Sequence, residues 1–95
     1  MDFESWIIKV KQRGDSTARK YRGAIHGRLS EMAIENGLTN NEIWKVHSLA
    51  EFSSLKAKLT DLDEFSVLNT KGNNMYSAAL NAYGQYLEYQ GAVRA

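Results

Sequence analysis

The chain of 95 residues contains no cysteine and no proline. The lack of cysteine excludes a disulfide framework, a thiolate zinc site and a cysteine nucleophile. No apolar run reaches the length of a membrane span. Residues 1–10 carry Asp2 and Glu4 ahead of a short apolar group, which is the wrong polarity for a signal peptide. We therefore expect a cytoplasmic protein without a membrane partner.

Patterns that carry catalysis are also missing. His26 and His47 are the only histidines and lie far apart in the sequence, which disfavours a metal centre. The acidic group Asp61, Asp63 and Glu64 lacks the glycine and the closing glutamate of a calcium loop. No serine lies in a GxSxG turn, and no glycine-rich loop leads into Lys-Ser or Lys-Thr. The sequence therefore predicts no catalytic residue, no metal ion and no cofactor in this chain.

What the chain does contain is typical of one small folded domain. Hydrophobic residues make up 43% of it, and we find no low-complexity tract, internal repeat or linker. Such a composition supports a modest core. We therefore expect a single helical domain over residues 1–95, which the native gene could extend further.

Apolar residues at helical spacing predict two helices in the N-terminal part. The first is expected to end at Gly14, and its buried stripe consists of Phe3, Trp6, Ile7 and Val10. The second is expected to begin at Asp15 or Ser16 and to end at Asn36 and Gly37. Its apolar side carries Ala18, Tyr21, Ile25, Leu29, Met32 and Ala33.

Two capping-box patterns predict the next two helices. Thr39 with Glu42 precedes a short helix, whose apolar residues are Ile43, Trp44 and Val46. Ser48 with Glu51 precedes a longer helix, which is expected to bury Leu49, Phe52, Leu55 and Leu59.

The C-terminal part is predicted to form a loop and one long helix. Residues 60–71 are acidic and then polar, which predicts a loop with a single turn around Phe65. The last helix is expected to start near Asn73 or Asn74 and to end at Gly91. About five helices of very different length, two of them long, predict an all-α fold in a compact orthogonal array rather than an up-and-down bundle.

The net charge of +1 conceals two blocks of opposite sign. Residues 1–30 hold three anions and seven cations, the latter being Lys9, Lys11, Arg13, Arg19, Lys20, Arg22 and Arg28. Residues 31–64 hold three cations and seven anions, the latter being Glu31, Glu35, Glu42, Glu51, Asp61, Asp63 and Glu64. This asymmetry favours one basic face, which attracts polyanions, and one acidic face; a merely solvated surface is the alternative.

Several residues of the basic block recur at helical spacing. One side of the predicted second helix carries Arg19, Arg22, Gly23 and His26, and Lys20 lies at the margin of that side. Gly23 and Gly27 each cost about 1 kcal/mol relative to alanine inside a helix. Either a phosphate chain approaches the helix backbone there, or another helix packs closely against it.

The segment NTKGNNMYSAAL leads into the last helix. Lys71 supplies charge, Gly72 permits a positive φ, and the free amides of a helix start attract an anion. Asn73 and Asn74 either cap the helix or pair with an adenine edge. Tyr76 is expected to stack, to pack, or to donate its hydroxyl to a phosphate. The segment therefore predicts a phosphate contact.

Much of the chain also resembles a known type of domain. The residues that carry the resemblance are Phe3, Trp6, Ser16, Thr17, Tyr21, Ile25, the run from Lys71 through Leu80, Tyr83, Tyr86 and Leu87. This pattern resembles the N-terminal helical domain of bacterial restriction-type endonucleases, which precedes a nuclease domain, often of the HNH kind. The first half is also similar to the core-binding domain of tyrosine recombinases. The endonuclease resemblance implies binding of double-stranded DNA, including modified DNA, for a nuclease domain in the same polypeptide.

These observations combine into a binding hypothesis. Lys71 and residues 72–74 would clamp one phosphate, while Arg19, Lys20 and Arg22 would contact the backbone across a groove. Base readout would fall to Asn73, Asn74 and His26. The alternatives are a protein-interaction or homodimerisation module, which would use Trp44, Phe52 and the acidic middle, and a small phage or plasmid regulator.

Overall fold

The structure, a computed structural model, describes residues 2–40, 42–46 and 48–94. These residues form helices and no strand, which confirms the predicted all-α class. The elements are α1 (Phe3–Lys9), α2 (Asp15–His26), α3 (Arg28–Glu35), the 3-10 helix η1 (Ile43–Lys45), α4 (Leu49–Thr60), α5 (Asp63–Lys71) and α6 (Met75–Arg94). No helix among the described residues combines the length and the apolar character needed to cross a membrane.

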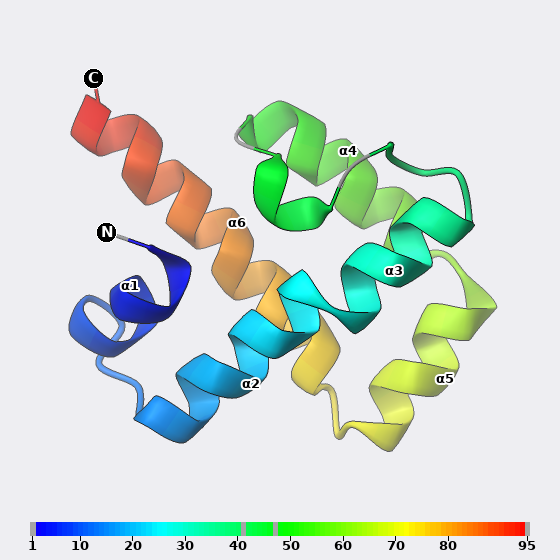
Figure 1. The fold of residues 1–95 in the computed structure, drawn as a ribbon, viewed down its shortest axis with the longest axis horizontal. Coiled ribbons are helices and arrows are strands. Elements are labelled where there is room, and N and C mark those ends of the chain that lie inside the picture. Colours follow the sequence, from blue (N-terminus) through cyan, green and yellow to red (C-terminus); the bar gives the residue numbers. More distant parts are fainter. Residues whose placement is uncertain (1, 41, 47, 95) are drawn as a thin grey trace.

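The longest helix, α6, is the centre of the fold. It runs diagonally through the molecule, and α2 crosses it (Figure 1). The helices α1, α4 and α5 also pack against α6, and the chain fills a flattened volume of 34 × 28 × 16 Å. The residues that α6 buries in the shared core are Ala79, Leu80, Ala82, Tyr83, Tyr86 and Leu87. The crossed packing agrees with the predicted compact array.

The predicted second helix is broken in two. At Gly27 the backbone takes the non-helical values φ −109° and ψ −99°, so α2 ends at His26 and α3 begins at Arg28. A Cβ at Gly27 would lie 2.9 Å from the carbonyl oxygen of Gly23, so only glycine fits. The buried hydroxyl of Ser30 supports the break, because it donates to the carbonyl of Ile25 and accepts from the N–H of Ile43 at 2.9 Å. The cost of Gly27 is therefore explained by the break rather than by helix packing or a ligand.

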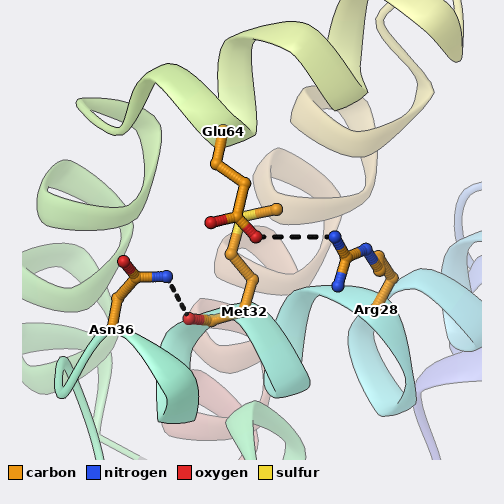
Figure 2. Close-up of polar contacts among 4 residues, drawn as sticks. All are labelled: Arg28, Met32, Asn36 and Glu64. Atoms are coloured by element: carbon orange, nitrogen blue, oxygen red, sulfur yellow. Dashed lines mark hydrogen bonds and ion pairs between the residues drawn. The ribbon is translucent and has the colours of Figure 1, made fainter.

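The predicted loop over residues 60–71 is wrong, because residues 63–71 form α5. Only Phe65 is fully buried in this helix, while Val67 is 57% exposed, so the apolar period was too weak to reveal a helix. A contact with α3 helps to hold α5 in place: Arg28 and Glu64 form an ion pair at 3.4 Å. Figure 2 shows this pair together with the buried Met32, whose side chain extends from α3 toward α5.

The helix ends follow the predicted caps only in part, because α2 begins after Gly14 and η1 after Glu42, and neither start has a side-chain cap. Ser48 caps α4 by accepting the N–H of Glu51, as predicted. The first helix ends at Lys9, well before Gly14, and leaves Val10 43% exposed. The last helix continues through Gly91 to Arg94, so the predicted stop at Gly91 is wrong.

Candidate nucleic-acid interface

The two charge blocks of the sequence are separated in space. The basic block lies on α1, the connection after it, α2 and the start of α3, whereas the acidic block lies on α3, α4 and α5 and in the connections between them. In Figure 1, α1 and α2 lie toward the left and α3 and α5 toward the right, with α4 between them at the top. The Arg28–Glu64 ion pair joins them. The helices α1 and α2 therefore form a basic end, and α3, α4 and α5 with their connections form an acidic end that meets the basic one where His26 contacts Trp44.

The cations of the basic block are exposed and mostly unneutralised. All seven are exposed to solvent. Within the described residues, only Arg28 among them forms an ion pair with a carboxylate. Lys11 and Arg13, which the sequence-based site omitted, border a hollow of about 200 Å³ between the α1–α2 connection and α6. The charge count was the only sequence signal for these two residues.

The predicted face on α2 is present. Arg19, Lys20, Arg22, Gly23 and His26 are all exposed. A Cβ at Gly23 would have no atom within 4 Å, so close helix packing does not explain this glycine. The bare backbone at Gly23 therefore leaves a shallow position on the basic face.

His26 differs from its neighbours on α2 because it has an aromatic partner. Its ring stacks on Trp44 of η1, with the ring centres 5.3 Å apart and the planes 14° from parallel. Burial against the protein lowers the pKa of His26, and the nearby Arg22 lowers it further, although Asp2 and Glu4 act in the opposite direction. These effects together favour the neutral form of the imidazole. Trp44 also has the Lys45 ammonium 5.3 Å from its ring centre.

The turn before α6 differs from the prediction in its backbone. Gly72 has φ −90°, whereas Asn73 and Asn74 take the left-handed values of 53° and 67°. The role of Gly72 is steric, because a Cβ there would lie 2.8 Å from Cε2 of Tyr76. The half-buried ring of Tyr76 thus packs on the turn, which is one of the three roles expected for it. The expected positive φ of Gly72 is wrong.

The amides at the start of α6 are largely occupied by the protein itself. Met75 donates to the carbonyl of Gly72 at 3.0 Å, and Ala78 donates to that of Asn74 at 3.1 Å. Ser77 donates to Oδ1 of Asn69 at 3.0 Å. Asn69 is therefore the side-chain cap of this helix, in place of Asn73 or Asn74. The sequence missed it because residue 69 was assigned to a loop, and the expected open anion seat is mostly closed.

The predicted site residues thus fall into three places. The first turns of α2 and the α5–α6 turn, which includes the exposed Lys71, both lie along the lower edge of the molecule in Figure 1. His26 lies away from that edge, at the end of α2 beside η1. Within the described residues, no group of three or more histidines, aspartates or glutamates could hold a metal ion.

Comparison of the chain with protein-family models, with curated proteins and with solved structures gave no match.

Proposed function

We propose that this chain is a binding module for double-stranded DNA that serves the target recognition of a restriction or modification-dependent endonuclease and has no catalytic role of its own. The observation that supports binding is the basic block, whose cations are exposed and, Arg28 excepted, have no carboxylate partner within the described residues. Neutralising DNA phosphates with such cations releases counterions and gives affinity without sequence choice. The endonuclease context rests on the sequence resemblance alone.

The proposed contact runs along α2. Arg19, Lys20 and Arg22 would hold phosphates, and the bare backbone at Gly23 would let the strand approach closely. Lys71 at the end of α5 would add a second, smaller contact. Asn73 is exposed, and its side chain makes no hydrogen bond within the described residues, so it is the better candidate of the two asparagines for a base edge.

A salt-titrated binding assay tests this proposal. The duplexes would be plain and cytosine-modified versions of one sequence, and the readout would be fluorescence anisotropy. If about four phosphates are neutralised, log K should fall with log salt at a slope of roughly −4. An affinity that does not change with salt would contradict the proposal. A difference between the two duplexes would support recognition of modified DNA.

A second candidate function is supported by the acidic end of the molecule. Trp44 and Leu49 are 39% and 37% exposed, and they lie close in sequence to Glu42 and Glu51. This surface suits a basic protein partner or a second copy of the chain. Phe52 is only 1% exposed and cannot contribute, contrary to the sequence-based expectation. Loss of partner binding on Glu51→Lys, together with no affinity for DNA, would favour this function.

A further inference from the structure

An aromatic pocket lies at the end of the basic face. It has a volume of about 200 Å³ and lies among the start of α1, the end of α2, η1 and α6. Its rings are Phe3, His26, Trp44, Tyr83 and Tyr86. Phe3, Tyr83 and Tyr86 are almost completely buried, whereas Trp44 is 39% exposed. The buried rings therefore form the floor and Trp44 forms an accessible wall.

The pocket is built from residues that hold one another in place. The hydroxyl of Tyr83 donates to the carbonyl of Val46 at 3.2 Å, which ties α6 to the segment after η1. The Phe3 ring meets Tyr83 edge to face at 5.2 Å, and His26 stacks on Trp44. Ligand sites in proteins are usually formed in advance in this way, with mainly apolar walls.

Two acceptor groups complete the lining. The Asp2 carboxylate caps α1 through the N–H of Ser5 at 2.8 Å, and this hydrogen bond lowers the pKa of Asp2. A carboxylate has about four acceptor positions, so one cap leaves room for a ligand. Gln90 donates its amide to the Tyr86 hydroxyl at 2.7 Å, and its carbonyl has no partner within the described residues. The pocket therefore offers acceptors to a ligand that brings donors.

The basic face of α2 leads directly to this pocket. His26 belongs to both, and Arg22, one turn earlier, is close enough to lower the pKa values of His26 and of Asp2. Gly23 lies between Arg22 and His26 in the same register and leaves the backbone bare. A strand held by Arg19 and Arg22 would therefore pass the mouth of the pocket.

We propose that the pocket takes a single nucleobase with an exocyclic amino group, swung out of a duplex on the α2 face and stacked on Trp44. This inference rests on the proposed DNA binding. Aromatic side chains stack on any base, whereas acceptors such as Asp2 and Gln90 favour the amino groups of adenine and cytosine over thymine. Swinging a base out is least costly where the base is mismatched.

The test compares three duplexes with the full chain at one salt concentration. One duplex is fully matched, one has an A·C mismatch whose bases both carry amino groups, and one has a T·T mismatch. The A·C duplex should bind about tenfold more tightly than the matched duplex, and the T·T duplex should gain less. A 2-aminopurine probe beside the mismatch should report unstacking.

Variants separate stacking from simple charge. Trp44→Ala should abolish the preference for A·C, Trp44→Phe should retain most of it, and both should keep the salt slope of the wild type. Asp2→Asn keeps a good N-cap but weakens the discrimination between A·C and T·T. Val67→Ala, which shortens another exposed apolar side chain on the distant α5, should change nothing.

The outcomes distinguish the two proposals. Equal, salt-dependent binding of all three duplexes would overturn the pocket and leave the proposed function intact. No binding of any duplex would overturn both. If deoxyadenosine monophosphate shifts the NMR signal of the Trp44 indole while no duplex does, the pocket holds a free nucleotide and the swung-out base is wrong.

Discussion

The α2 face and the α5–α6 turn were expected to bind phosphate together, but they differ in how many of their hydrogen-bond donors are already used within the fold. On α2 the side chains of Arg19, Lys20 and Arg22 extend into solvent with no carboxylate to pair with among the described residues. In the turn, Asn69 and the backbone already occupy most of the helix-start amides. Donors that are satisfied within the fold stabilise it, whereas exposed and unpaired charges remain available for a ligand.

The largest effect is expected from Arg19→Gln combined with Lys20→Gln. Removing two phosphate contacts should lower DNA affinity about tenfold or more and make the salt slope shallower by about 1.8. Arg22 is left in place because it also acts on Asp2 and His26. Salt-titrated anisotropy measures both quantities.

The matched control is Lys56→Gln combined with Lys58→Gln on α4, which removes the same charge from the acidic end. Its salt slope should stay near that of the wild type. Equal losses in the two double variants would show that net charge, and not the α2 face, determines binding.

Gly72→Ala should destabilise the fold by about 1–2 kcal/mol, because the new Cβ would meet the Tyr76 ring at 2.8 Å. Urea unfolding measures this change. Gly91→Ala, where a Cβ would meet nothing within 4 Å, is the control and should be neutral or stabilising. If Gly72→Ala leaves the free energy of unfolding unchanged, the turn tolerates a side chain and the packing of Tyr76 on it is loose.

Asn69→Ala should cost about 1 kcal/mol, since it removes the cap from the N–H of Ser77. Asn73→Gly serves as the comparison, because that side chain caps nothing among the described residues and glycine accepts the left-handed backbone at φ 53° without strain. Chemical denaturation of both variants should rank Asn69→Ala as the less stable. The reverse order would return the capping role to Asn73.

Gly23→Ala should stabilise the protein by up to about 1 kcal/mol, because the site is helical and open. If a strand approaches the backbone there, the same change should also weaken DNA binding. A more stable variant with unaltered affinity would remove Gly23 from the proposed contact.

The smallest effect is expected from Lys71→Gln. One exposed cation without an ion pair among the described residues should change the salt slope by about 0.9 and leave the thermal midpoint unaffected. A loss as large as that of the α2 double variant would restore the turn as a principal contact.

Among the helical features, those that depend on near neighbours in the sequence were predicted, and those that depend on distant contacts were missed. The stripe of Phe3, Trp6 and Ile7 and the Ser48 cap were predicted because both depend on neighbours within one or two turns. The helix α5 was missed because it buries only Phe65 fully and depends on packing against α4 and α6 and on the ion pair with α3. The break at Gly27 was missed because the apolar period of Ile25 and Leu29 continues across it.

The candidate site was predicted where it depends on charge and missed where it depends on geometry. The exposed cations of α2 were identified from spacing alone. The capping by Asn69 required knowledge that α5 ends against α6, and the stack of His26 on Trp44 joins residues from different elements. DNA binding itself remains a prediction.

By itself, the sequence determined that this protein is all helical and that its charge is divided into a basic and an acidic block. Both properties follow from residue type and local spacing, which the chain carries whatever its tertiary arrangement. Only the tertiary structure decided which hydrogen-bond donors have no partner within the fold. It also decided that Phe3, Trp44 and Tyr83 line one pocket. The physical reason is that hydrogen-bond satisfaction and ring packing depend on partners that folding brings together from distant parts of the sequence.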